Sequence, residues 1–124
     1  MLPLYLIALG ILMFAGQDSD LTGTWAGDAR MTGSTEMDHI ILVLEKSADS
    51  YSGKLSDSRG LFKDEPIRDV TFRNNNLRFK ATARSTGREI IVDFGLNYFQ
   101  GRFIGGWGAG AGDFGPLDLS REKE

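Results

Sequence analysis

The sequence predicts an all-β protein, a single eight-stranded antiparallel up-and-down barrel that follows an N-terminal hydrophobic segment. From Leu21 onward, short runs that alternate apolar and polar residues recur every ~8–12 residues, and clusters of Gly, Asn, Asp and Ser separate them. No run after the N-terminal segment has a helical period. Strands joined by short turns favour an up-and-down sheet, and closing that sheet into a barrel removes its exposed edges.

Eight runs carry this pattern and are expected to form the strands. They are residues 21–31, 38–46, 51–57, 67–72, 77–84, 88–96, 102–108 and 116–121. Along each run every second side chain is expected to face inward, as Ile40, Leu42 and Leu44 do in the second run. Ile41 and Val43 make the outer face of that run apolar as well, so the same strand could also be covered from outside.

The connections between the runs contain residues that suit turns. Asn74, Asn75 and Asn76 tolerate positive φ and predict the clearest hairpin of the chain. Residues 61–65 are expected to be a loop that Pro66 ends, and residues 32–34 and 97–101 are expected to be turns. Short connections of this kind bring each strand back beside the previous one.

Length and composition set the class of protein. The chain has 124 residues, which favours one domain, taken as residues 17–124 with the barrel core at about 21–121. The formal net charge of −3 and the pI of about 5.1 argue against a nucleic-acid partner and against anionic lipid as a main target. The absence of cysteine excludes disulfides, thiolate metal sites and a cysteine nucleophile.

Residues 1–16 are apolar, and the chain turns polar directly after them. An apolar stretch of roughly 7–15 residues that ends in small residues is typical of a secretory signal, whereas a membrane span needs ~20 residues. The sequence therefore predicts a signal peptide and a secreted or periplasmic protein. Two alternatives remain: an uncleaved N-terminal anchor, which would tether the protein to a membrane through this segment, and a buried first element.

The glycine-rich stretch 105–115 contains two apparent nucleotide motifs. Residues 110–115 match G-x-G-x-x-G, and Asp113-Phe114-Gly115 spells a kinase tripeptide. A dinucleotide site needs a helix after the glycines and an acidic residue ~20 positions further on, but only nine residues follow Gly115 and the first is Pro116. We therefore expect no cofactor here. Residues 105–108 are expected to form a curved strand with an inward Trp107, and residues 109–115 the turn after it.

The ionisable residues do not form a set that indicates catalysis. His39 is the only histidine, so a catalytic triad or a multi-histidine metal site would depend on it alone, and it is expected at the rim of the barrel. Asp57, Asp64, Glu65 and Asp69 gather around one loop but lack the spacing of a calcium-binding loop. The sequence predicts neither catalytic residues nor a metal site.

Two short motifs resemble those of a known group of barrels. Gly23-Thr24-Trp25 resembles the G-x-W opening of the calycins, the group that contains lipocalins and avidins, and residues 117–121 resemble the last strand of a lipocalin. The opening Gly23–Gly27 is also similar to extracytoplasmic bacterial barrel domains that begin G-x-W-x-G. The resemblance implies structural roles for Gly23, Trp25 and Arg121, with the arginine packed over the tryptophan. Avidins carry polar residues that bind biotin at the positions where this chain has Ala26 and Gly27, so the resemblance does not extend to biotin binding.

These observations predict a non-catalytic extracytoplasmic binding module that could hold a small apolar ligand in the barrel. The candidate ligand-binding residues are the aromatic side chains on the predicted inward faces: Trp107, Trp25, Tyr51, Phe79, Phe94 and Phe103. Among them, Trp25 is expected to be a structural plug and Trp107 a pocket wall.

Two other functions stay open on the sequence. One is a structural or protein-interaction barrel with a filled core, which would use strand 39–46 or an outer basic face to bind a partner. That basic face would consist of Arg78, Lys80, Arg84 and Arg88. The other is a small-barrel enzyme that uses a buried carboxylate beside a tyrosine.

Overall fold

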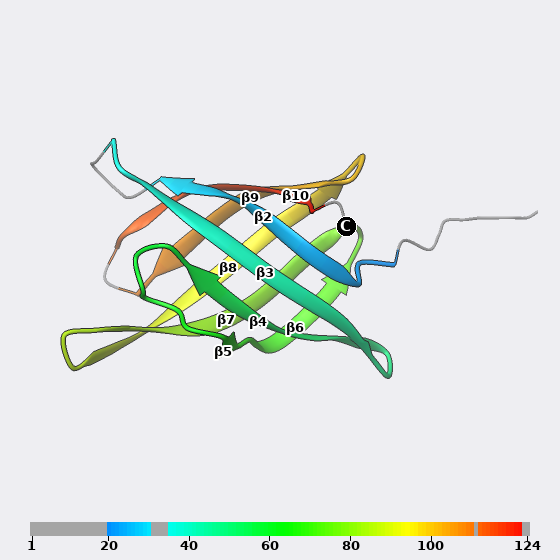
Figure 1. Cartoon of the computed structure of the whole chain (residues 1–124). Coiled ribbons are helices and arrows are strands. Elements are labelled where there is room, and N and C mark those ends of the chain that lie inside the picture. The colour runs from blue at the N-terminus through cyan, green and yellow to red at the C-terminus, as the bar shows by residue number, and fades with distance from the viewer. Residues whose placement is uncertain (1–19, 31–34, 111, 123–124) are drawn as a thin grey trace, which may run out of the picture.

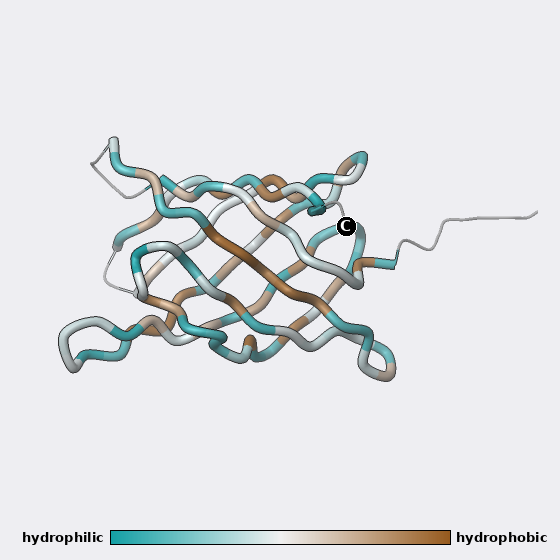
Figure 2. The backbone as a smooth tube through the Cα atoms, in the orientation of Figure 1, coloured by the Kyte–Doolittle hydropathy of each residue, from teal (hydrophilic) through white to brown (hydrophobic). Residues whose placement is uncertain are grey.

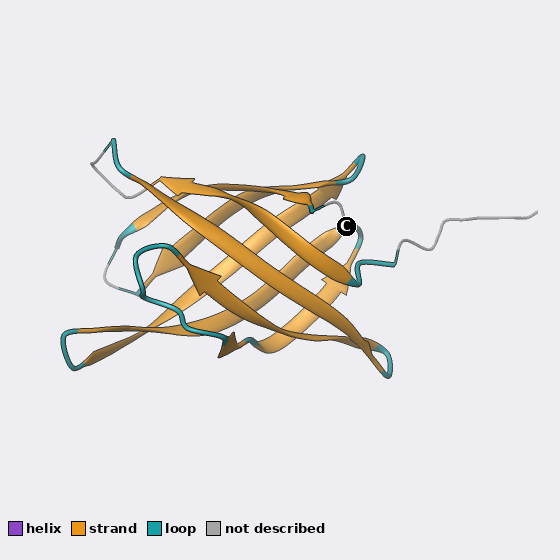
Figure 3. Ribbon diagram, in the orientation of Figure 1, coloured by secondary structure: helices purple, strands orange, loops and turns teal. Residues whose placement is uncertain are grey.

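Alternating apolar and polar side chains build nine strands in the part of the chain that the computed structural model describes, residues 20–30, 35–110 and 112–122. The strands are β2 (Gly23–Arg30), β3 (Met37–Ser47), β4 (Ser50–Asp57), β5 (Glu65–Pro66), β6 (Arg68–Arg73), β7 (Asn76–Ser85), β8 (Arg88–Phe99), β9 (Arg102–Ala109) and β10 (Phe114–Arg121). They form one antiparallel sheet that curves into a nearly closed barrel, as Figure 1 and Figure 3 show. Within the described ranges there is no helix long and apolar enough to cross a membrane.

The order of the strands is that of an up-and-down barrel. Neighbours in the sheet run β5-β4-β3-β2-β10-β9-β8-β7-β6, so chain neighbours pair except β5 and β6, and the last described strand lies against the first described one. Leu119 of β10 lies opposite Gly27 of β2 in that antiparallel pair. The expected all-β up-and-down fold is confirmed, as is the closure of the C-terminal strand on the N-terminal one.

The two ends of the sheet meet at a seam between β4 and β6. No continuous ladder of described residues joins these strands. The backbone N–H of Ile67 donates to the carbonyl of Gly53 at 3.0 Å, and the Ser50 hydroxyl donates to the carbonyl of Val70 at 3.2 Å. These bonds hold the barrel nearly closed.

The prediction of eight strands is wrong by one, because β5 lies where a loop ending at Pro66 was expected. Glu65 and Pro66 pair with Leu55 and Lys54 of β4. Proline is tolerated there because β5 is at the edge of the sheet, where no further strand needs its missing N–H.

The last two hairpins also differ from the prediction. β8 continues to Phe99, which pairs with Arg102, so the turn is only Gln100-Gly101, both at positive φ, and not residues 97–101. β10 begins at Phe114, before Pro116. The expectations for residues 1–16 and 32–34 lie outside the described residues.

Positive φ explains the hairpin between β6 and β7. Asn74 and Asn75 have φ values of 52° and 63°, and Phe72 on one side pairs with Leu77 on the other. Asparagine adopts positive φ more readily than most residues because its short side chain can hydrogen-bond to the nearby backbone. The hairpin that the asparagine run predicts is confirmed.

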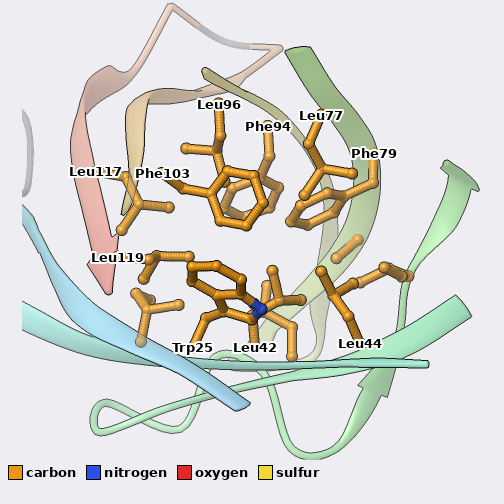
Figure 4. Close-up of a cluster of buried hydrophobic side chains, with 14 of the residues drawn as sticks. Trp25, Leu42, Leu44, Leu77, Phe79, Phe94, Leu96, Phe103, Leu117 and Leu119 are labelled. Carbon is orange, nitrogen blue, oxygen red and sulfur yellow. The ribbon is translucent and has the colours of Figure 1, made fainter. Parts of the chain in front are cut away.

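Large apolar side chains fill the barrel. Ile40, Leu42 and Leu44 point inward from β3 as expected, at 3%, 0% and 0% exposure, and Figure 2 shows the apolar middle of this strand. In Figure 4 the labelled side chains from opposite walls point toward one another. The fully buried ones are Trp25, Phe79, Phe103, Leu21, Leu42, Leu44, Leu55, Leu77, Leu96, Leu117 and Leu119. Each contributes about 1.5–3 kcal/mol by burial, so packing alone can stabilise a chain without disulfides.

Candidate functional site

One end of the barrel is closed by a tryptophan and the segment that precedes β2. The indole Nε1–H of Trp25 donates to the carbonyl of Leu21 at 2.9 Å, and the N–H of Leu21 donates to the Tyr51 hydroxyl at 3.2 Å. Trp25 and Leu21 are completely buried, and the Phe103 ring lies 4.5 Å from that of Trp25. These contacts make Trp25 part of the packed core.

Arg121 covers this closed end from the last strand. Its guanidinium lies 4.4 Å from the centroid of the Trp25 ring and donates to the carbonyls of Thr22 at 2.6 Å and Asp20 at 2.9 Å. A Cβ at Gly23 would lie 3.1 Å from the same guanidinium. The structure thus brings together Gly23, Trp25 and Arg121, the residues to which the resemblance implies structural roles.

The opposite end carries a small apolar cavity. Its volume is about 50 Å³, and it is lined by Ala29, Asp38, Ile40, Leu61, Phe62, Ala83, Val92, Phe94 and Trp107. These residues come from the end of β2, the start of β3, the loop after β4, the end of β7, the start of β8 and the end of β9. Drug-sized ligands occupy pockets of about 300–1,000 Å³, so this cavity holds a group of a few atoms and not a whole ligand.

The structure divides the six predicted ligand-binding residues between the two ends. Trp107 and Phe94 line the cavity, and Phe79 stacks behind Phe94 with ring centroids 4.7 Å apart. The other three, Trp25, Phe103 and Tyr51, lie around the closed end. Two of the six residues, Trp107 and Phe94, therefore line this cavity.

Four exposed apolar side chains lie on the strand ends near the cavity. Met37 precedes Asp38 at the start of β3, Ile90 and Ile91 precede Val92 in β8, and Phe114 begins β10. Their exposures are 47% for Met37, 37% for Ile90, 51% for Ile91 and 68% for Phe114. We call these four side chains the apolar rim.

The loop after β4 covers part of the cavity with Phe62, which the sequence analysis left without a role. Phe62 is 5% exposed and its ring lies 6.1 Å from that of Phe94. Its N–H donates to Asp57 Oδ1 at 2.8 Å, and the N–H of Arg84 donates to the carbonyl of Leu61 at 3.0 Å. The apolar pair Leu61-Phe62 inside a polar loop is the sequence feature that could have predicted this contact.

A buried carboxyl group beneath this loop was also missed. Asp38 is 2% exposed, and its Oδ1 accepts hydrogen bonds from the Ser58 hydroxyl at 2.9 Å and the Arg59 N–H at 3.2 Å. Burial, together with the hydrogen bond to Asp57 and the charge on it, raises the pKa of Asp38 to about 6. The Ser58 and Arg59 hydrogen bonds act in the opposite direction and only partly offset this rise.

Asp57 is the partner of this carboxyl. Its Oδ2 is buried and has no hydrogen-bond donor among the described residues when both carboxyls are ionised. A proton on Asp38 supplies that donor, because a protonated carboxyl donates one hydrogen bond. Asp38 and Asp57 form what we call the carboxyl pair.

Two other polar groups near the mouth are His39 and the indole nitrogen of Trp107. His39 Nδ1 lies 3.1 Å from Asp28 Oδ1, with both side chains about half exposed, so the histidine lies on the outer surface of the rim. Trp107 Nε1 is buried and has no hydrogen-bond partner among the described residues. Neither arrangement supplies a base next to a nucleophile.

The side chains of the predicted acidic loop and of the predicted basic face form separate pairwise contacts. Asp64 bonds to Ser56, and Glu65 pairs with Arg84. Lys80 pairs with Asp93 at 2.6 Å. No group of three His, Asp or Glu residues in the described ranges could hold a metal ion.

Comparison of the chain with protein-family models, with curated proteins and with solved structures found no match.

Proposed function

We propose that this protein is a non-catalytic binding module of calycin-like architecture whose binding site is the open end of the barrel. The observation that carries the proposal is the apolar cavity of about 50 Å³ at that end, with the apolar rim on the neighbouring strand ends. The cavity takes the end of a small apolar molecule, and the remainder lies over the rim. Leucine and aromatic side chains pack against one another in the described interior of the barrel.

The polar groups around the cavity support binding without catalysis. Asp38 is the only ionisable side chain among the described lining residues, and its Oδ1 accepts two hydrogen bonds from the loop. Catalysis would require an acid, a base and a nucleophile that converge on one reacting atom.

We propose a secreted or periplasmic location on the pattern of residues 1–16, with a membrane anchor as the alternative.

A partner protein is the second candidate occupant of the same site. Met37, Ile91 and Phe114 are exposed and lie outside the cavity, where a partner would bury them while one of its apolar side chains entered the cavity. Substitution of Phe114 by Ser would then weaken a complex seen by native mass spectrometry, while short apolar probes would still bind.

The test uses linear alkanols of about four to about ten carbons as probes, with the tryptophan fluorescence, to which Trp25 and Trp107 both contribute, as the readout. Native mass spectrometry of the protein purified from its host reports any ligand that stays bound. We expect saturable binding that Ala83→Leu abolishes, because the larger side chain fills the cavity. Thr82→Val on the same strand is the matched control, since Thr82 lies on the opposite face. Binding by none of the alkanols, or equal binding by the Ala83→Leu variant, would show that the cavity is not the site.

A further inference from the structure

The loop 58–62 contributes Leu61 and Phe62 to the cavity wall, and two carboxyl groups help to fasten it beside the backbone bonds Ser58–His39 and Arg84–Leu61. Asp38 Oδ1 accepts from Ser58 and Arg59 at one end of the loop. Asp57 Oδ1 accepts from the Phe62 N–H at the other end. Phe62 is thereby held against Phe94 as one wall of the cavity.

The two carboxyls are also neighbours on the strand pair β3–β4, because Asp57 pairs with Ile40, two residues along β3 from Asp38. Asp57 Oδ2 is buried without a donor, and the two side chains are linked by a hydrogen bond only when one of them carries a proton. Two ionised carboxylates in this position repel each other in surroundings that are almost entirely apolar. One proton on the carboxyl pair therefore adds to the hold on the loop, beside the backbone bonds of Ser58 and Leu61.

No neighbouring group replaces that proton. The charged or titratable residues on the elements around Asp38 are Asp28 and Arg30 of β2, Glu36 and His39 beside it, Asp57 of β4 and Arg59 of the loop. The Arg59 guanidinium pairs with Glu36 at 2.5 Å, and His39 pairs with Asp28. Across the cavity, the described residues of β7, β8 and β9 contribute only apolar or indole side chains.

We propose that the proton shared between Asp38 and Asp57 is a latch that holds the loop 58–62 over the mouth of the barrel, and that its loss lets the mouth open. The latch controls access to the binding site and so rests on the proposed function for its purpose. Its mechanism does not depend on any ligand. The protein would admit its ligand more readily in neutral than in acidic surroundings.

Amide hydrogen exchange of the full chain tests the latch directly, because the N–H groups of Arg59 and Phe62 donate to the two carboxyls. Protection factors are compared at about pH 4.5 and about pH 7.5, on either side of the pI of about 5.1. The protection factors of these amides are expected to fall about 20-fold at the higher pH. This fall follows because Asp38 has a pKa of about 6 in the latched state and its ordinary pKa in the open state, so a higher pH favours the open state. The ladder amides of Trp25 and Leu42, far from the loop, report global unfolding and are expected to lose much less protection.

Two isosteric variants keep the test decisive. Asp38→Asn and Asp57→Asn each place an NH₂ group between the two side chains at every pH, so the latch stays fastened and the fall in protection disappears. Either variant suffices if the other fails to fold. His39→Gln is the control for the neighbouring histidine and retains the wild-type response, since histidines also change charge in this range.

The proposal is overturned if the wild-type amides are equally protected at both pH values, if both asparagine variants respond as the wild type does, or if His39→Gln removes the response. No ligand is present in this experiment, so its failure leaves the alkanol result standing. Absence of alkanol binding, in turn, leaves the latch intact.

Discussion

The guanidinium of Arg121 lies 4.4 Å from the ring of Trp25, so the last strand of the barrel covers the tryptophan of the first. The same guanidinium donates to the carbonyls of Asp20 and Thr22, which belong to the segment before β2. β10 and β2 are already paired as a ladder. Arg121 adds a second connection between the two ends of the described chain. It does so beside the β2–β10 ladder, and loss of that ladder would open the barrel.

Replacing Arg121 by alanine is expected to lower the free energy of unfolding by about 1–2 kcal/mol, through loss of the cation–π contact and the hydrogen bonds to the carbonyls. Arg121→Lys keeps the charge but not the forked donors, so its loss is expected to be smaller. Urea denaturation measures both. An alanine variant with the wild-type midpoint would show that the contact contributes nothing to stability.

The two aromatic residues Trp107 and Phe103 are expected to respond differently to truncation. Phe103 is completely buried against Trp25, so Phe103→Ala lowers the free energy of unfolding by about 3–5 kcal/mol. Trp107 is half-buried in the cavity wall, and Trp107→Ala costs about 1–2 kcal/mol while it removes alkanol binding. Thermal unfolding and a probe titration read by native mass spectrometry, which does not need the Trp107 fluorophore, separate the two effects. Equal losses of stability would place Trp107 in the core and not in a binding site.

The sequence predicts the barrel well because strand alternation is a local property. Inward positions such as Leu42 follow directly from a period of two, and the asparagine run marks its hairpin by residue chemistry. The two-residue strand β5 is too short to show any alternation, and it forms only because β4 offers an unpaired edge. Such an element depends on tertiary context that a sequence pattern does not carry.

The candidate site was less predictable for a related reason. Aromatic residues on inward faces are identified by alternation, but alternation does not say at which end of the barrel a ring lies or whether space remains beside it. Asp38 was expected to begin a strand, and nothing local indicates that the loop 58–62 folds over it. The carboxyl pair is created by residues 19 positions apart that meet only in the fold.

The stability of the protein is expected to depend on pH through Asp38. Because the folded-state pKa of about 6 lies above the ordinary value of 3.8, the folded protein binds the proton more tightly than the unfolded chain does. Stability is then greatest below the ordinary pKa and falls as the pH rises through about 6. Relative to Asp38→Asn, the free energy of unfolding is expected to fall by about 2 kcal/mol between about pH 4 and about pH 7. Urea denaturation at a series of pH values measures this difference, and parallel curves for the two proteins would contradict it.

The glycine-rich strand β9 offers a matched pair of substitutions in one stretch. A Cβ built on Gly105 would overlap the backbone carbonyl of Gly95 in β8, whereas one on Gly108 meets no atom within 4 Å. Gly105→Ala must therefore push two strands apart and is expected to cost about 2–3 kcal/mol or more. Gly108→Ala is expected to change stability by less than about 1 kcal/mol, and it can stabilise by restricting the unfolded chain. If both variants unfold at the wild-type urea concentration, then close strand approach is not the reason for the glycine at 105. If both are strongly destabilised, backbone freedom and not space is what this stretch requires.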